Sequence, residues 1–444
     1  MHPKTRQTLS EILHTQSIPG RDDLHIARNF ERLRSVLDAV RHTPEQEEVY
    51  AHVHFYLEQT ANRASRFLLS PQLTSSSARQ GLFAIRDQAM TTIEEYFLQA
   101  PPQDQLIVSG RGHSASSAVG ELSPKPFKHI PYSVVRIPAG HNREVYAQLA
   151  RQGGCQKEKR YHVRPQQSTG SHEWPLKLVC APQAWDTTRG EGVRVAVLDT
   201  GVDYTHPSLA NRFTQNKGYD FIHNTPQPRD DNGHGTHVAG SIASERFGVA
   251  PDATLYALKF LNQHGSGGEV DLLRALEWCY DHNVNIVNAS FGSSHPSQAE
   301  KAACDFLAKN NILIVAAAGN DGNTKYSYPA SYDSVVSVAA VDKHKKHARF
   351  SQANNQVNIA SPGVEVNSCY PNNTTKYLSG TSMATPHVAG GAALVFAQQP
   401  TSGYVREVLD VSAENLGDAH KFGSGLLRCD KAAQVAQLHS RWKQ

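Results

Sequence analysis

Residues 193–199 read VRVAVLD, and TGVD follows at 200–203. From residue 195 every position is apolar until Asp199, which predicts a strand buried on both faces. Gly201 turns the chain directly after that strand. The stretch therefore predicts an inner strand of a parallel sheet, with a carboxylate at its carboxyl end.

Similar apolar runs recur along the chain and alternate with helical patterns. The runs are ATLYALKFL at 253–261, VNIVNAS at 284–290, ILIVAAAGN at 312–320 and VVSVAAV at 335–341, and the helical patterns lie at 269–282 and 297–310. Strands that are apolar on both faces and alternate with helices predict an α/β domain of three layers, with helices on both sides of a mostly parallel sheet. In such a sheet, ligands bind beyond the carboxyl ends of the strands.

Length and composition suit a soluble protein of two or three domains. The chain has 444 residues, of which 39% are hydrophobic and 19% charged, and its net charge is only +3. A charge this small gives no reason to expect nucleic acid or a membrane surface as a partner. No apolar run resembles a membrane span or a secretory signal, so we expect a cytoplasmic protein unless another export route operates. The six scattered cysteines predict reduced, mostly buried thiols.

Two further polar residues lie where helices are predicted to begin. His234 stands between two glycines in DDNGHGTHVAG at 230–240, and Ser382 lies in SGTSMATPHVAG at 379–390, just before a helix that is apolar all round. Free imidazole titrates near neutrality, so His234 suits a general base. The free N–H groups and the positive dipole end of a helix start suit a nucleophilic serine whose attack creates an oxyanion.

Asn320 is a fourth candidate, because it ends a buried run and its amide could donate a hydrogen bond to an oxyanion. Single residues have other interpretations. An aspartic protease needs two carboxylates that share a proton, and the sequence has one D-T-G. A zinc site at His234 and His237 lacks a third ligand at a familiar spacing. An ordinary turn or helix cap would explain each polar residue taken alone.

Together, the four segments resemble the subtilisin-like serine proteases, or subtilases. DTGVD matches the family's Asp motif, HGTHVAG its His motif, AAGND its oxyanion Asn motif and GTSMATPHVAG its Ser motif, in the family's order. The resemblance covers roughly 174–437 and implies a serine endopeptidase. It implies that Asp199 orients His234, that His234 deprotonates Ser382, and that Ser382 forms an acyl-enzyme while Asn320 holds the oxyanion.

The same resemblance implies a groove for an extended protein or peptide substrate. NASFG at 288–292 and HGSGG at 264–268 would flank that substrate and bind its backbone. The implied substrate-binding residues are Gly265, Ser266, Gly267, Ser290, Phe291, Gly292, Gly319 and Ser327. Asp321 lies near the specificity pocket and would favour a basic side chain. No carboxylate stands clearly at the base of the pocket, so we expect a large uncharged or hydrophobic residue before the scissile bond.

The implied chemistry requires no cofactor. Many bacterial subtilases bind calcium through an Asp in H-P-D-L, where this chain reads HPSL with Ser208. The calcium loop that is usual after the HGTHVAG helix is also missing. A weaker calcium site around Pro329 and Asp342 is a further hypothesis, with backbone carbonyls and a carboxylate as ligands.

Three regions are predicted along the chain. Residues 1–102 show helical periodicity without a readable role, and a protein partner for them is one hypothesis. Residues 103–170 contain the strand patterns LIVSG, YSVVRIP and KRYHVRP, a helical pattern at 142–152 and the start of a polar linker at 166–173. Residues 171–438 form the predicted catalytic domain.

The region 103–165 also resembles, more weakly, the inhibitory propeptide of subtilases. That resemblance implies a zymogen, in which the propeptide covers the groove and the same molecule cuts the chain within 165–173. Two other functions stay open at this point. One is a non-catalytic binding module that keeps its propeptide as a plug. The other is an acyl transferase such as a peptide cyclase, in which an amine replaces water.

Overall fold

The computed structural model of the chain describes residues 105–109, 125–136, 155–163, 166–167, 174–398 and 401–442. The chain divides after Pro102, and every described residue belongs to the second unit, Gln103–Gln444. The helices predicted in residues 1–102 and at 142–152 lie outside the described residues. No helix of the described part is both long and apolar enough to cross a membrane.

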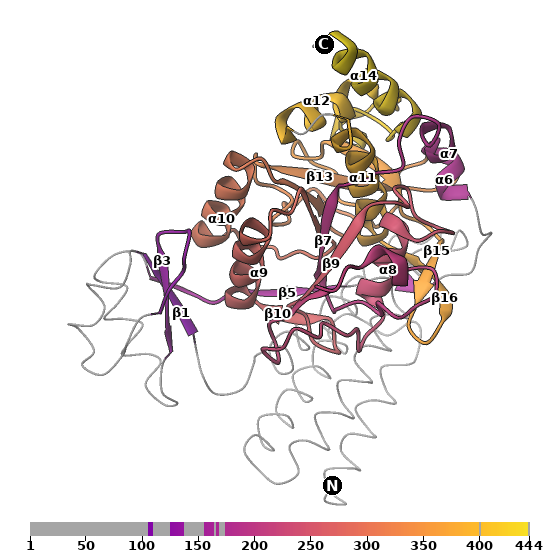
Figure 1. Cartoon of the computed structure of the whole chain (residues 1–444). Coiled ribbons are helices and arrows are strands. Elements are labelled where there is room, and N and C mark those ends of the chain that lie inside the picture. Colours follow the sequence, from indigo (N-terminus) through magenta and orange to yellow (C-terminus); the bar gives the residue numbers. More distant parts are fainter. Residues whose placement is uncertain are drawn as a thin grey trace, which may run out of the picture. The chain divides into compact units, whose positions relative to one another are not determined.

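A seven-stranded sheet forms the centre of the catalytic domain (Figure 1). Its spatial order is β14 (Ile359–Pro362), β13 (Val335–Val341), β12 (Leu313–Ala317), β11 (Ile286–Ala289), β7 (Arg194–Asp199), β9 (Thr254–Lys259) and β8 (Gly218–Asp220). All neighbouring pairs are parallel. Every residue of β12 and of β13 is buried, as runs that are apolar on both faces require.

Helices cover both faces of this sheet (Figure 1). One layer contains α9 (Glu269–Asp281) and α10 (Gln298–Lys309), which pack on each other. The other contains α8 (His234–Ala243) and α11 (Thr381–Phe396), with α12 (Ser402–Ser412) and α14 (Cys429–Trp442) outside α11. The expected three-layer α/β domain is therefore confirmed. Short elements complete this part: α6 (Trp174–Leu178), α7 (Ala181–Ala184), η1 (Ala210–Arg212) and α13 (Ala419–Phe422).

The strands that precede this domain fall into two groups: four form a sheet of their own, and two pair with strands of the catalytic domain. An antiparallel sheet has the order β2 (Lys125–Pro126), β3 (Tyr132–Arg136), β1 (Gln105–Ser109) and β4 (Cys155–Lys157). Two short strands instead add to the catalytic domain: β5 (Arg160–His162) pairs with β10 (Ser266–Gly268), and β6 (Gln166–Gln167) pairs with β16 (Thr374–Ser379). β16 also pairs with β15 (Val366–Tyr370). The strand predictions in LIVSG, YSVVRIP and KRYHVRP are thus confirmed.

The segment predicted as a polar linker needs one correction. Its first two residues form β6, because their backbone bonds to that of Leu378 and Ser379, a contact with distant residues that a local pattern cannot reveal. The cysteines follow the expectation where they are described. Cys279, Cys304, Cys369 and Cys429 are buried free thiols, and Cys180 is a partly exposed one.

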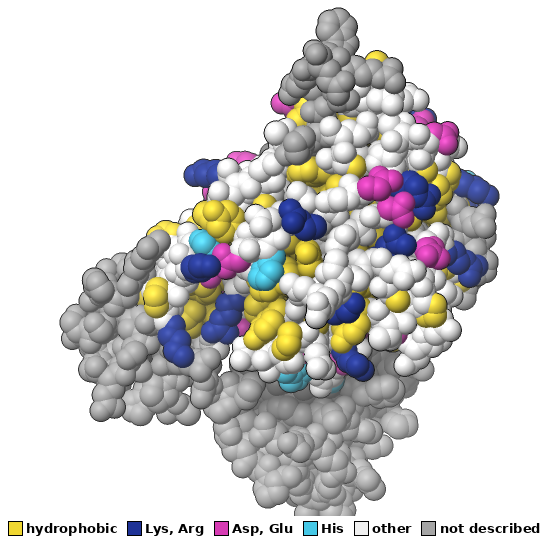
Figure 2. All heavy atoms as spheres, in the orientation of Figure 1, with side chains coloured by type: hydrophobic (Ala, Val, Ile, Leu, Met, Phe, Trp, Pro, Cys, Tyr) yellow, Lys and Arg dark blue, Asp and Glu magenta, His cyan; other side chains and the backbone are white. Residues whose placement is uncertain are grey.

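Charge is spread over the face drawn in Figure 2, where acidic, basic and apolar side chains are interspersed. This distribution agrees with the small net charge of the whole chain, +3.

Candidate active site

Asp199 and His234 form a buried pair at the carboxyl end of the sheet. Asp199 ends β7 and His234 begins α8, and their side chains are 0% and 1% exposed. Nδ1 of His234 lies 2.8 Å from one carboxylate oxygen and 2.9 Å from the other, while the backbone N–H of Thr200 donates to Oδ1 at 2.7 Å. A carboxylate that accepts from Nδ1 keeps the proton on that nitrogen and leaves Nε2 as the basic one.

The glycine after His234 explains how the helix can begin so close to β7. A Cβ at Gly235 would lie 2.0 Å from the backbone oxygen of Gly201, closer than real Cβ atoms come. Gly233 has φ of +105°, a conformation that favours glycine. The HG motif is therefore a packing requirement as well as a catalytic signal.

Nε2 of His234 is buried and has no hydrogen-bond partner in the structure. A buried polar atom without a partner is rare and calls for an explanation. The basic nitrogen of an imidazole that awaits a proton from a nucleophile provides one.

Ser382 lies in the first turn of α11, which begins at Thr381 rather than after the serine as predicted. The residue is 2% exposed, and its Oγ donates to the backbone oxygen of Ser290 at 2.9 Å. The hydroxyl of Ser290 in turn donates to the backbone oxygen of Ser382 at 2.9 Å. No hydrogen bond joins Ser382 to His234 here, so a transfer of the hydroxyl proton to Nε2 would require the hydroxyl to rotate away from Ser290.

Asn320 is held at the start of the same helix by Thr381, which the sequence analysis did not single out. Oδ1 of Asn320 accepts from the backbone N–H of Thr381 at 2.7 Å and from its hydroxyl at 2.8 Å. With Oδ1 occupied in this way, the amide nitrogen is the atom of Asn320 that remains to bond an oxyanion.

Two other buried histidines do not compete with His234 as the base. Burial lowers the pKa of His237 to about 3 and that of His387 to about 4. Nε2 of His237 lies 3.1 Å and 3.0 Å from two backbone oxygens, those of Val366 and Lys376. These two contacts fix the ring of His237, and among the described residues no group of three or more His, Cys, Asp or Glu side chains could hold a metal ion, so the zinc interpretation gains no support.

The chain's own β5 lies between the two segments predicted to bind substrate, 264–268 and 288–292, in what we call the groove. Tyr161 and His162 of β5 pair antiparallel with Gly267 and Ser266 of β10, and His162 also forms a bridge to Gly292 on the other side. Figure 1 places β5 beside β10. The backbone N–H of Val163 donates to the oxygen of Gly265 at 3.0 Å.

Glycine is needed on both walls of this groove. A Cβ at Gly267 would lie 2.1 Å from the backbone oxygen of Phe260, and one at Gly292 would lie 2.4 Å from Oγ of Ser327. Both approaches are to atoms of the catalytic domain itself, whereas a Cβ at Gly265 would lie 2.5 Å from the Val163 side chain of the segment in the groove. The approach at Gly292 also places the predicted residue Ser327 beside it.

The remaining specificity-pocket residues are only partly brought together. Gly319 has φ of +113° and packs against the side chain of Gln352. Phe291 is buried and contacts Phe260, with ring centroids 4.7 Å apart. Asp321 is exposed, which gives no support to an acidic base of the pocket.

The weak calcium hypothesis gains no positive support from the described residues. Oδ1 of Asp342 accepts from the backbone N–H groups of His344 and Lys346 at 2.8 Å and 2.9 Å, as in an ordinary turn. The backbone oxygen of Pro329 accepts from the N–H of Tyr332. Within the described ranges, no three His, Cys, Asp or Glu side chains gather as metal ligands would. The calcium site stays a prediction.

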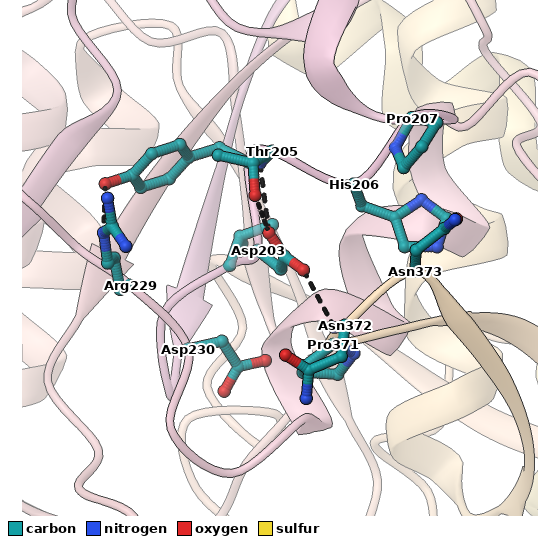
Figure 3. A pocket seen from close by; sticks show the side chains of 11 residues that line it. Asp203, Thr205, His206, Pro207, Arg229, Asp230, Pro371, Asn372 and Asn373 are labelled. Carbon is teal, nitrogen blue, oxygen red and sulfur yellow. Dashed lines mark hydrogen bonds between the residues drawn. The ribbon is translucent and has the colours of Figure 1, made fainter.

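A separate cavity of about 340 Å³ lies beside the turn that follows Asp199 (Figure 3). Asp203 in its lining accepts from the hydroxyl of Thr205 at 2.6 Å and from the N–H of Asn372 at 3.1 Å. Oδ1 of Asp230 accepts from the backbone N–H groups of Asn232 and Gly233 at 3.0 Å and 2.8 Å. Both carboxylates hold loops in place, so this cavity adds no group to the site.

Comparison with known proteins agrees with this geometry. The profile of the Subtilase family matches residues 190–425, a range that contains Asp199, His234, Asn320 and Ser382. Subtilisin Savinase of Lederbergia lenta is 42% identical over 269 residues, which are 59% of this chain and 98% of that protein. The chain belongs to the subtilase family.

Two further relatives are similar to this subtilase over a comparable range. An alkaline protease of Alkalihalobacillus alcalophilus is 42% identical over 59% of this chain and 70% of its own length. Subtilisin DY of Bacillus licheniformis is 41% identical over 55% of this chain and 92% of its own length. The protein is thus a subtilisin-like serine endopeptidase, as the motifs predicted. The groove-filling strand β5 lies before the matched range.

Proposed function

We propose that this subtilase is an active endopeptidase that uses Asp199, His234 and Ser382 as its catalytic triad and is made as an autoprocessed zymogen. The unpartnered, buried Nε2 of His234 carries this proposal. The carboxylate of Asp199 orients the imidazole through Nδ1, and Nε2 takes the proton of Ser382 as its Oγ attacks the peptide carbonyl. His234 then gives that proton to the leaving amine, and water releases the acyl group.

The negative charge that develops on the carbonyl oxygen needs donors that are already in place. Asn320 and the backbone N–H of Ser382 are the proposed donors. The two bonds from Thr381 to Oδ1 fix the amide of Asn320 before substrate arrives, so little reorganisation is needed during the reaction.

The region 103–165 is the proposed intramolecular inhibitor. β5 occupies the groove with the antiparallel pairing that an extended substrate would use. Gln166 pairs with Ser379, three residues before Ser382, and only residues 164 and 165 separate it in sequence from Val163. Strands that lie close together in sequence therefore pair with β10 in the groove and with the strand that ends just before the nucleophile's helix, which supports the prediction of self-cleavage within 165–173.

Side chains outside the groove support the same role. Lys128 forms an ion pair with Asp281 at 2.8 Å, and the N–H of His129 donates to Glu277 at 2.5 Å. The ring of His129 stacks on Phe306 with centroids 5.4 Å apart. The region is thus held on α9 and α10 as well as in the groove.

Purified wild type and Ser382→Ala test the proposal together. We expect the wild type to cleave casein, to react with a fluorophosphonate at Ser382 and to show a new N-terminus within 165–173. Ser382→Ala should lose all three properties. Ser294→Ala, which changes an exposed serine near the groove, is the matched control and should behave as wild type.

The outcomes separate the competing functions. A wild type that neither cleaves casein nor reacts with the probe is a binding module, and the proposal fails. Cyclic products in mass spectra would favour an acyl transferase. Maturation of pure Ser382→Ala would show that another protease cuts the chain.

A further inference from the structure

Tyr161 fills a closed pocket beside the groove. Its side chain is 0% exposed, and its ring meets Phe291 and Phe260 edge to face, with centroids 5.3 Å and 6.0 Å away. Because Tyr161 belongs to β5, which pairs with β10 as a substrate would, its side chain occupies the place of a substrate side chain. The residues around Tyr161 therefore indicate which side chain the catalytic domain prefers at this position of a peptide in the groove.

A buried carboxylate forms the base of this pocket. Glu300 lies in the first turn of α10 and is 0% exposed. Its Oε1 accepts from the hydroxyl of Tyr161 at 2.7 Å. Its Oε2 accepts from the hydroxyl of Tyr332 at 2.8 Å and from Nζ of Lys159 at 2.5 Å. Tyr332 belongs to the catalytic domain, whereas Tyr161 and Lys159 belong to the segment in the groove.

Lys159 and Tyr161, the two partners from the segment in the groove, stabilise the buried carboxylate of Glu300 in different ways. The Lys159 ammonium supplies the opposite charge, and it also lies 4.8 Å from the centre of the Tyr161 ring. The Tyr161 hydroxyl supplies the donor for the oxygen that Tyr332 does not reach. Burial raises the pKa of Tyr161 well above its usual range, so this hydroxyl stays protonated as a donor.

A phenylalanine in the same place would cover Oε1 of Glu300 without giving it a donor. A buried carboxylate oxygen without a partner costs far more than the hydrogen bond itself contributes. Only tyrosine combines an aromatic ring of this size with a hydroxyl at its tip. A site built to bond a hydroxyl discriminates strongly against the analogue that lacks it.

We propose that Glu300 is a specificity-determining residue that makes this subtilase select protein substrates with the sequence Lys-Xaa-Tyr in the stretch that pairs with β10. The inference rests on the proposed function, because it takes β5 as a stand-in for substrate. Proteins that contain Lys-Xaa-Tyr are a substrate class, whereas the catalytic triad by itself does not select among peptide sequences.

Competition between peptides tests this selection with the purified full chain. The peptides carry the sequence of residues 158–170, with either Tyr or Phe at the position of Tyr161, and a third has Met in place of Lys159. Each peptide is measured as a competitive inhibitor of casein cleavage, so the result is the same whether it is cut or only binds. The Phe peptide should bind about tenfold or more weakly than the Tyr peptide, and the Met peptide should also bind more weakly.

Variants of Glu300 separate selection from a structural role. Glu300→Leu should reverse the Tyr-over-Phe ratio, and Glu300→Gln should shrink it. A merely structural role would weaken both peptides equally and leave the ratio unchanged. Glu245→Gln, at a carboxylate that is 60% exposed and pairs with Arg212, should keep the wild-type ratio. Should Glu300→Leu fail to fold, as judged by fluorophosphonate labelling, the Gln variant decides.

Two results would overturn the inference, and they differ in what else they affect. An active wild type that binds the Tyr and Phe peptides within twofold of each other removes the role of Glu300 alone. A wild type without casein cleavage or labelling removes the proposed function and this inference with it.

Discussion

Replacing Asn320 by Ala removes the proposed side-chain donor to the oxyanion and leaves the catalytic triad in place. Loss of one such donor typically lowers kcat by about 10²–10³-fold, which corresponds to about 2.7–4 kcal/mol of transition-state stabilisation. Substrate binding should change little, because the charge on the carbonyl oxygen develops only in the transition state. We therefore expect a large fall in kcat with a nearly unchanged KM.

The structure adds a second effect that must be kept apart from the first. Asn320 also accepts two bonds from Thr381, at 2.7 Å and 2.8 Å, so the Ala variant leaves the N–H and the hydroxyl of Thr381 without this acceptor. Each lost bond costs about 1 kcal/mol of folding stability. Thr381→Val removes one of those bonds and keeps the amide of Asn320. It also removes the acceptor of the Gly319 N–H, so it measures the positioning of this turn without loss of the oxyanion donor and should lower kcat far less than Asn320→Ala.

Initial rates on a quenched peptide give kcat and KM, with active molecules counted by fluorophosphonate labelling. This counting removes any contribution from unfolded or unprocessed protein. An Asn320→Ala variant with wild-type kcat would refute the oxyanion role. Equal losses in Asn320→Ala and Thr381→Val would instead assign the effect to positioning of the helix start.

Two more predictions concern the buried acids. Asp199→Asn should lower kcat by about 10⁴-fold in steady-state assays. The N–H of Thr200 would hold the amide oxygen at the position of Oδ1, so the amide NH₂ group would face Nδ1 of His234 and disfavour a proton on it. A wild-type kcat would contradict the orienting role. Burial raises the pKa of Glu269 to about 7 from 4.5, so between these pH values the unfolded chain has lost a proton that the folded chain keeps. Stability against urea, measured in Ser382→Ala to prevent self-digestion, should fall by up to about 3 kcal/mol as the pH rises through this window. Glu269→Gln should flatten that slope, and an equally steep slope in this variant would assign it to other groups.

The sequence alone predicts the sheet and the polar residues at its edge, for a physical reason that is local. β7, β12 and β13 are runs of apolar residues that only a sheet covered on both faces can bury. Asp199 is recognisable because a carboxylate rarely follows such a run without a function. Roles for these residues came from the family resemblance, since spacing along the chain does not measure distances.

Other parts of the site leave no local pattern. Glu269 and Glu300 stand in the first turns of α9 and α10, where acidic residues are common because they interact favourably with the helix dipole. Contacts with residues distant in sequence distinguish them from ordinary surface charges: Lys159 and Tyr161 donate to Glu300, and the backbone N–H of Lys159 and the hydroxyl of Ser297 donate to Glu269. The orientation of the Ser382 hydroxyl is a choice between staggered side-chain conformations, which the sequence does not encode by itself.

The contacts around Ser382 bear on how latency of the proposed zymogen would arise. The bond from its hydroxyl to Ser290 is a single neutral hydrogen bond, worth about 1 kcal/mol, so it delays attack only slightly.

β5 presents a larger barrier, because its backbone bonds to β10 and the buried ring of Tyr161 must all be released before another peptide can enter. An aromatic side chain of this kind buries about 150–250 Å². Asp199 and His234 are already paired while β5 is in place, so latency would come from occupancy of the groove and not from a distorted catalytic site. Removal of the segment should then give activity without a rearrangement of the catalytic domain.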